Sequence, residues 1–147
     1  MKVHYSSKTN EWSTPQDLFD ALNAEFHFTL DPCANSENAK CTKFYSKEDD
    51  GLSKDWRGER VFINPPYGRE ISKWVKKIAK EGGVALLPAR TDTRWFHDWI
   101  YEKAEIRFIK GRLHFNDDYR KGRRAPFPSM VVIFKVDHLT PKTKEVR

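Results

Sequence analysis

The chain has 147 residues, of which 38% are hydrophobic, 33% charged and 14% aromatic, and its formal net charge is +6. That aromatic content is enough for a folded core and argues against a disordered chain. No stretch approaches the ~20 apolar residues that a membrane span needs. Residues 1–10 are too polar for a signal peptide, so a cytoplasmic protein is expected.

The charge is distributed unevenly along the chain. Residues 1–50 carry five basic and nine acidic side chains, whereas residues 51–100 have a net charge of +4 and residues 101–147 a net charge of +6. This pattern favours a polyanionic partner for the later part and a neutral or cationic ligand for the first third. Charge that serves only solubility is the alternative.

Metal and disulfide sites are not expected. Cys33 and Cys41 are too far apart in sequence for a CxxC pair, and the five histidines are scattered without metal-binding spacing. In a reducing compartment the two cysteines are expected to stay unpaired.

Helices and strands are predicted to alternate. Thr14 followed by Pro15 is typical of a helix start, with Thr14 as the N-cap. The predicted helices cover residues 15–25, 70–81 and 91–102, with a turn or short helix at 35–40. The predicted strands cover residues 26–31, 42–46, 60–64, 84–87, 104–109 and 130–134. This order predicts an α/β fold with a largely parallel sheet, whose ligands bind at the carboxyl ends of strands.

The segment Asn64-Pro65-Pro66-Tyr67 directly follows a predicted buried strand. The two prolines lack N–H groups and stiffen the loop, so the Asn64 side-chain oxygen and the Pro65 carbonyl are acceptors without competing donors. Two such acceptors can bind the hydrogens of a planar exocyclic amine, while Tyr67 offers a flat face to the ring. Acceptors placed for a more tetrahedral nitrogen would favour its attack as a nucleophile. A simple sharp turn after the strand is the other interpretation.

This tetrapeptide resembles the signature of S-adenosylmethionine-dependent enzymes that methylate adenine N6, cytosine N4 or glutamine N5. Further matching segments lie in order at residues 11–15, 30–34, 49–52, 87–93 and 110–115. Together they resemble the phage-type DNA N-6-adenine methyltransferase (Dam) family from about residue 10 to residue 135. The resemblance implies a compact Rossmann-like methyltransferase domain over residues 1–140, a disordered tail at 141–147, and the host cytoplasm as the location of a phage-encoded enzyme.

The resemblance also implies how S-adenosylmethionine is held. Thr14 and Pro15 would take the place of a Thr-Pro pair at the methionine end, and Asp31 would face the ammonium group. Asp50 would bind the adenosine part of the cofactor. The usual loop glycines after Asp31 are absent, and Asn35 is expected to replace one of them in a left-handed conformation. The full predicted set of cofactor contacts is Trp12, Thr14, Pro15, Asp31, Pro32, Ala34, Asn35, Asp50, Leu52 and Asn64.

The sheet is expected to be trimmed. Only 33 residues separate Asp31 from Asn64, and each βαβ unit takes roughly 30 residues. Five or six strands with helices on both faces are therefore predicted, the last two pairing antiparallel.

Double-stranded DNA is the expected substrate. Methylating a base amino group in a duplex requires extruding that base from the stack. Basic side chains must then hold the phosphates. The predicted DNA contacts are Arg90, Thr91, Arg94, Arg112, Arg120, Lys121, Arg123 and Arg124.

The predicted activity is methyl transfer from S-adenosylmethionine to adenine N6, with Asn64, Pro65, Pro66 and Tyr67 as the catalytic residues. Cytosine-N4 methylation, protein glutamine methylation and a non-catalytic DNA-binding module with this fold are the alternatives. Double-stranded DNA and the cofactor are the expected partners, with neither membrane nor metal. The acidic first third is assigned to the cationic cofactor and the basic remainder to DNA.

Overall fold

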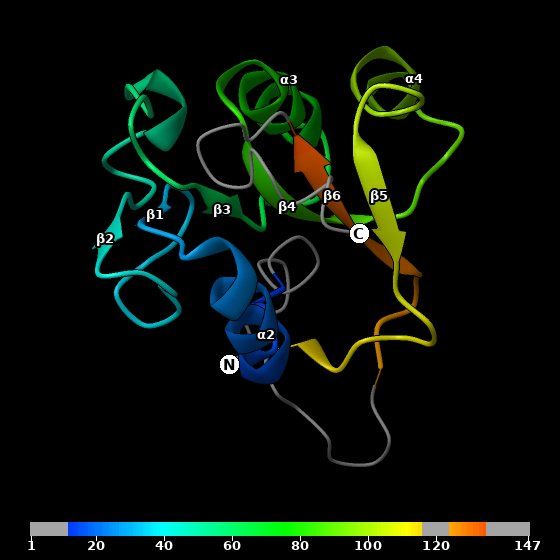
Figure 1. The fold of residues 1–147 in the computed structure, drawn as a ribbon, viewed down its shortest axis with the longest axis horizontal. Helices are drawn as coiled ribbons and strands as arrows, with labels where there is room; N and C mark the ends of the chain where they lie inside the picture. The colour runs from blue at the N-terminus through cyan, green and yellow to red at the C-terminus, as the bar shows by residue number, and fades with distance from the viewer. Residues whose placement is uncertain (1–11, 116–123, 135–147) are drawn as a thin grey trace, which may run out of the picture.

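The computed structural model describes residues 12–115 and 124–134. In chain order the elements are α2 (Gln16–Phe26), β1 (Leu30–Asp31), β2 (Lys43–Phe44), the 3-10 helix η1 (Gly51–Ser53), β3 (Phe62–Ile63), α3 (Ile71–Glu81), β4 (Gly83–Pro88), α4 (Arg94–Trp99), β5 (Glu105–Phe108) and β6 (Ser129–Phe134) (Figure 1). The predicted α/β class is confirmed. The expected tail at 141–147 lies outside the described residues, and a single domain over 1–140 stays a prediction.

The strands form two hydrogen-bonded sheets. One has four strands in the order β3-β4-β6-β5, and the other is the parallel pair β1-β2. β3 pairs parallel with β4, whereas β6 lies antiparallel to both β4 and β5. A parallel bridge between Leu30 and Val61 links β1 to the residue before β3. The expected antiparallel pairing of the last two strands is confirmed, so the four-stranded sheet is mixed, whereas the two-stranded sheet is parallel.

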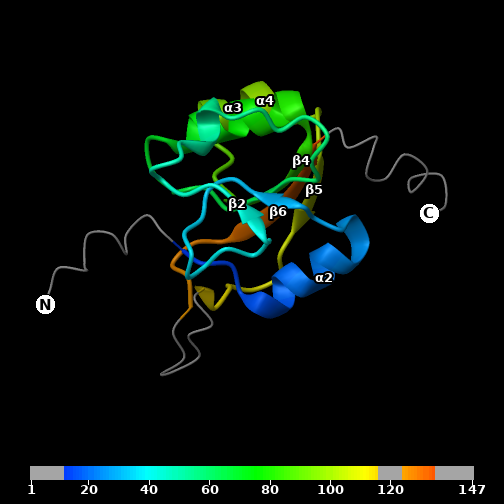
Figure 2. The ribbon, with the colours of Figure 1, turned by 90° about the vertical axis from the view of Figure 1, so that its left-hand side faces the viewer.

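The central strands β4 and β6 are buried along their whole length, and because alternate residues of a strand point to opposite sides, both faces of the sheet are covered there. Along β4, Val84 and Leu86 pack with the apolar stripe of α2, formed by Phe19, Leu22 and Phe26. Ala85 and Leu87 pack with α3 and α4 on the other face. Figure 2 shows α3 and α4 together on one side of the strands and α2 on the other.

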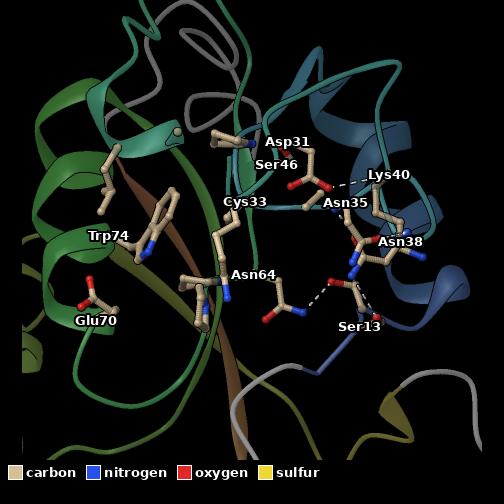
Figure 3. A pocket seen from close by; sticks show the side chains of 18 of the residues that line it. Ser13, Asp31, Cys33, Asn35, Asn38, Lys40, Ser46, Asn64, Glu70 and Trp74 are labelled. Carbon is tan, nitrogen blue, oxygen red and sulfur yellow. Dashed lines mark hydrogen bonds between the residues drawn. The ribbon is translucent and has the colours of Figure 1, made fainter. Parts of the chain in front are cut away.

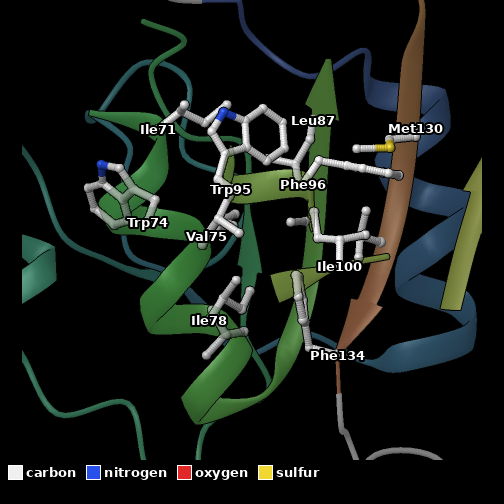
Figure 4. Packing of buried hydrophobic residues seen from close by; sticks show 14 of the residues in the cluster. Ile71, Trp74, Val75, Ile78, Leu87, Trp95, Phe96, Ile100, Met130 and Phe134 are labelled. Atoms are coloured by element: carbon white, nitrogen blue, oxygen red, sulfur yellow. The ribbon is translucent and has the colours of Figure 1, made fainter. Parts of the chain in front are cut away.

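Helix α3 has the predicted amphipathic pattern. Its buried residues are Ile71, Trp74, Val75 and Ile78, as expected from their spacing of three and four residues. Figure 4 shows Ile71, Val75 and Ile78 lying toward Trp95, Phe96 and Ile100, while the Trp74 ring points to the other side. All of them belong to one buried cluster with Leu87, Met130 and Phe134 of the sheet. This packing holds the N-terminus of α3, and with it the preceding loop 64–70, against the sheet.

Two predicted boundaries were wrong for local reasons. The predicted strand 26–31 begins only at Leu30, because Phe26 belongs to α2. His27 ends that helix at φ 55°, donating its N–H to the Asn23 carbonyl, and the Asn23 side chain accepts the N–H of Phe28. The helix predicted over 91–102 is only α4, since the Thr93 hydroxyl accepts the Phe96 N–H and sets the helix start there.

Candidate active site

The two polar strand ends singled out in the sequence meet at one cavity. Asp31 is the last residue of β1, and Asn64 directly follows β3. The parallel bridge between Leu30 and Val61 places these two strand ends side by side. The cavity has a volume of about 500 Å³. Its lining includes every predicted cofactor residue except Pro15, namely Trp12, Thr14, Asp31, Pro32, Ala34, Asn35, Asp50, Leu52 and Asn64, together with Pro65 and Pro66.

Both N–H groups of the Asn64 side-chain amide donate hydrogen bonds. Its Nδ2 donates to the backbone carbonyl of Trp12 and, over 2.9 Å, to Oγ1 of Thr14. Its Oδ1 is buried and accepts no hydrogen bond from any residue that the structure describes. A buried acceptor without a partner costs free energy, so such an atom points to a missing donor.

Thr14 contributes to this site and not to helix capping. It was predicted as the N-cap of the first helix, but Pro15 occupies the cap position and no side chain caps the helix. The Thr14 side chain is buried, and its hydroxyl oxygen accepts from Asn64, 50 positions further along the chain. The N-cap prediction is therefore wrong, because a long-range partner takes the oxygen that would have served the helix.

Asp31 is a buried carboxylate at the cavity wall. Its Oδ2 accepts the backbone N–H of Lys40 at 3.0 Å (Figure 3). Burial raises the pKa of Asp31 from its ordinary 3.8 to about 6, although the N–H groups of Lys40 and Cys33 act in the opposite direction. A cationic group placed beside this carboxylate would stabilise its ionised form.

The loop after Asp31 turns without the expected left-handed asparagine. Asn35 is not among the described residues with positive φ; its side chain accepts the N–H groups of Glu37 and Asn38 at 2.8 and 2.9 Å. Such an Asx turn replaces a glycine turn without backbone strain. The left-handed residue is Asp50, with φ 57°. The expectation for Asn35 was wrong because its side chain, not its backbone, makes the turn.

The adjoining loop depends on Gly51. A Cβ at this position would lie 2.0 Å from the Pro32 carbonyl oxygen, a backbone atom that has no room to move aside. The Gly51 carbonyl also accepts the indole N–H of the buried Trp56 at 3.0 Å. Gly51 therefore lets the segment of Asp50 and Leu52 lie directly against the loop that follows Asp31.

The opposite wall comes from α3 and was missed in the sequence. Figure 3 shows Glu70 and Trp74 on one side and Asn35, Asn38 and Lys40 on the other, with Cys33 and Asn64 between them. Glu70 and Trp74 are one helical turn apart just after the proline loop, and this spacing could have indicated a shared wall. The other lining residues not predicted as cofactor contacts are Ser13, Cys33, Asn38, Lys40, Ser46, Lys47, Glu48 and Gly51.

Tyr67 lies behind the cavity and does not line it. The ring is buried, and its hydroxyl donates to the Leu86 carbonyl at 3.5 Å. Its centroid is 5.5 Å from that of Phe127 and 6.4 Å from that of Phe115, both in edge-to-face orientation. The structure thus places Tyr67 where it supports the loop, and not where its face is open to a base.

The predicted DNA contacts are only partly described. Arg120, Lys121 and Arg123 lie outside the described residues, whereas Thr91, Arg94, Arg112 and Arg124 are exposed. The Arg90 guanidinium lies 5.7 Å from the Phe127 ring, which in turn packs on Tyr67, so Arg90 is close to the proline loop. Arg112 donates to the Ala125 carbonyl at 3.4 Å and so joins the two ends of the basic segment, residues 112–124.

Within residues 12–115 and 124–134, no three His, Cys, Asp or Glu side chains are grouped to hold a metal ion. No helix in the same part of the chain is long and apolar enough to cross a membrane.

Sequence comparisons identify relatives of this chain. The profile of the DNA N-6-adenine-methyltransferase (Dam) family matches residues 3–144. A DNA N-6-adenine-methyltransferase of Escherichia phage T1 is 34% identical over 124 residues, which are 78% of this chain and 52% of that protein. One of Haemophilus phage HP1 is 29% identical over 84% of this chain and 78% of its own length. The putative methyltransferase YfdM of Escherichia coli is 39% identical over 40% of this chain and 71% of its own length. The chain spans about half the length of the T1 protein. Its match to the family profile over nearly its whole length shows that it belongs to the DNA N-6-adenine-methyltransferase (Dam) family.

Proposed function

We propose that this protein transfers a methyl group from S-adenosylmethionine to the N6 amino group of an extruded adenine in DNA. The observation that carries the proposal is the buried, unpartnered Oδ1 of Asn64 at a cavity bounded by a rigid proline loop. The family match and the printed names of the T1 and HP1 relatives support adenine N6 as the acceptor.

The cavity suits the proposed cofactor in size and chemistry. About 500 Å³ is within the usual range for a small-molecule site. The buried carboxylate of Asp31 would face the ammonium group, and the loop of Asp50 and Leu52 would hold the adenosine. When bound, S-adenosylmethionine supplies an electrophilic methyl group on a sulfonium.

Asn64 and Pro65 would act on the acceptor amine. Asn64 Oδ1 and the Pro65 carbonyl would each accept one hydrogen of the exocyclic NH2. An amine held this way is favoured in the pyramidal state, in which its lone pair is no longer delocalised into the ring. Tyr67 would act from behind, keeping the proline loop in place through its packing on Phe115 and Phe127.

The strand pairings are compatible with a trimmed methyltransferase sheet. If the Leu30–Val61 bridge is taken as a link between the two sheets, β1 to β5 run in one direction and only β6 runs opposite. We propose that this set corresponds to the reduced Rossmann-like sheet expected from the short Asp31–Asn64 interval. The carboxyl ends of β1 and β3 then lie where such sheets bind their ligands.

Double-stranded DNA is the proposed partner, held through phosphates by the basic side chains around the site. Arg90 lies beside the proline loop, and Arg112 and Arg124 lie at the two ends of the basic segment. Binding is therefore expected to weaken steeply with salt.

The direct test is incubation with methyl-labelled S-adenosylmethionine and unmethylated duplex DNA, followed by digestion to nucleosides. N6-methyladenine is the expected product. N4-methylcytosine, label on protein, or DNA binding without any transfer would each overturn the proposal in favour of one of its alternatives.

Asn64→Ala is expected to abolish transfer while leaving DNA binding largely intact, because it removes the proposed acceptor and no phosphate contact. Asn23→Ala is the matched control, because it makes the same truncation at the end of α2, away from the cavity, where the side chain accepts the Phe28 N–H. Full activity of Asn64→Ala contradicts the catalytic assignment.

A further inference from the structure

We propose that Trp12 and Thr14 together form a holder that requires a hydrogen-bond donor on the side chain at position 64 and directs the oxygen of that side chain toward the acceptor amine. This positioning role differs from the cofactor contact expected for both residues, and it rests on the proposed function for its catalytic consequence.

The hydrogen-bond pattern determines which way the amide points. An Asn side chain has two N–H donors on one end and an acceptor oxygen on the other. Both donors of Asn64 are used, one on the Trp12 carbonyl and one on the Thr14 hydroxyl oxygen at 2.9 Å. Turning the amide over would set Oδ1 against the Trp12 carbonyl, an acceptor facing an acceptor. In Figure 3 the nitrogen of Asn64 accordingly points toward the segment that carries Ser13, and the oxygen points away from it.

The holder itself is anchored by packing. The Trp12 indole meets Phe115 and Phe127 edge-to-face, with centroids 5.5 and 5.3 Å apart. The same two rings pack on Tyr67, three residues after Asn64. The segment of Trp12 and the proline loop are thus held by one aromatic cluster, which keeps the Trp12 carbonyl at a constant place relative to Asn64.

The holder distinguishes an ionised carboxylate from an amide at position 64. Asn64→Asp keeps the shape of the side chain but replaces the donor nitrogen with an oxygen. An ionised carboxylate would set a charged oxygen against the Trp12 carbonyl, which cannot donate. A protonated carboxyl would donate its one proton to that carbonyl and leave the other oxygen free for the amine. Asn64→Asp should therefore work only in the protonated form.

The acidic and basic side chains that line the cavity are the same in the wild type and in Asn64→Asp; they are Asp31, Lys40, Lys47, Glu48, Asp50 and Glu70. Burial raises the pKa values of the Cys33 thiol and the Tyr67 phenol, so both stay neutral near pH 7. The informative quantity is therefore the ratio of the variant rate to the wild-type rate at each pH, in which the contributions of these shared groups largely cancel.

The first test is the single-turnover methyl-transfer rate at saturating S-adenosylmethionine and DNA between pH 5 and pH 9. The ratio of the Asn64→Asp rate to the wild-type rate is expected to rise at least about tenfold from pH 8 to pH 6, as one proton is taken up. A ratio that is independent of pH overturns the holder.

The second test separates positioning from cofactor binding. Thr14→Val keeps the shape but removes the acceptor, and it is expected to slow transfer about tenfold, the effect of losing one hydrogen bond, with cofactor Kd nearly unchanged. Thr14→Ser, which restores the oxygen, should return the rate to within a few-fold of wild type. Thr42→Val makes the same change at an exposed site outside the cavity and should leave the rate unchanged. Weaker cofactor binding with an unchanged saturated rate in Thr14→Val overturns the positioning role.

A third readout does not depend on activity. The side-chain NH2 signals of Asn64 in a 15N–1H spectrum, assigned by their loss in Asn64→Ala, should exchange slowly with solvent in the wild type and faster in Thr14→Val. Rapid exchange in the wild type overturns the holder. If the wild type transfers no methyl group but these signals are protected, the proposed function fails while the holder stands.

Discussion

Asp31→Asn is expected to stabilise the cofactor-free protein while weakening its binding of S-adenosylmethionine. Asp31 is only 4% exposed, and burial raises its pKa from 3.8 to about 6. Raising the pKa from 3.8 to about 6 corresponds to about 3 kcal/mol by which the fold disfavours the ionised carboxylate. The variant amide carries no charge and can still accept the Lys40 N–H through its oxygen.

The sign of the pH dependence follows from the raised pKa. The folded protein holds the Asp31 proton more tightly than the unfolded chain, so this group lowers stability progressively as the pH rises from about 4 to about 6. The stabilisation of Asp31→Asn should be near zero at pH 4 and full above pH 6. As an upper bound, about 3 kcal/mol raises the Tm of a domain of this size by roughly 6–12 °C.

Thermal unfolding followed by circular dichroism at pH 4, 5, 6 and 7.5 measures this gain, with and without S-adenosylmethionine. The cofactor should raise the Tm of the wild type far more than that of Asp31→Asn, because the variant would lack the proposed counter-charge of the ammonium group. Asp49→Asn is the control. Hydrogen bonds from Ser46 lower the pKa of the exposed Asp49, so its contribution is lost as the pH falls and its replacement should not stabilise.

Two outcomes would refute the reasoning. One is an Asp31→Asn variant that is no more stable than the wild type at pH 7.5. The other is a gain of the same size at pH 4 and pH 7.5, which would show that ionisation of this carboxyl is not what costs stability.

Two further predictions concern the cavity loop and DNA. Gly51→Ala is expected to lower both Tm and cofactor affinity, since the added Cβ would overlap the Pro32 carbonyl. Gly58→Ala is the control: Gly58 has φ +82°, but a Cβ there would have no atom within 4 Å. This variant should lose about 1–2 kcal/mol of stability and no cofactor affinity. Equal losses of affinity in the two variants, measured by calorimetry, contradict this role of Gly51. Arg124→Ala should weaken DNA binding and reduce the slope of log K against log salt by about 0.9, the value for one phosphate contact. The same change at the exposed Arg57, which pairs with Asp55, should leave the slope unaltered; an unaltered slope in Arg124→Ala means that Arg124 contacts no phosphate.

Local sequence patterns predicted much of the fold. The spacing of Ile71, Trp74, Val75 and Ile78 predicted the buried face of α3, because a helix puts such residues on one side whatever surrounds it. The position of Asn64 directly after an apolar strand predicted its place at a sheet edge. These features depend on neighbours in sequence, which is why they could be predicted without a structure.

The boundaries and turns that failed were decided by competing hydrogen bonds. Thr93 and not Thr91 begins α4, because the Thr93 hydroxyl accepts the Phe96 N–H. Asn35 turns the chain with its side chain, and the left-handed backbone is at Asp50 instead. Each alternative was locally allowed, so composition and spacing could not distinguish them.

The sequence by itself determined the family, the α/β class and most members of the candidate site, because motif residues and hydrophobic periodicity are local properties. Only the tertiary structure decided what those residues do to one another. Thr14 meets Asn64 across 50 positions, Lys40 supplies its N–H to Asp31, and Trp74 closes the opposite wall. The physical reason is that a hydrogen-bond donor selects its acceptor within about 3 Å, and distances of that size are set by the packing of whole elements.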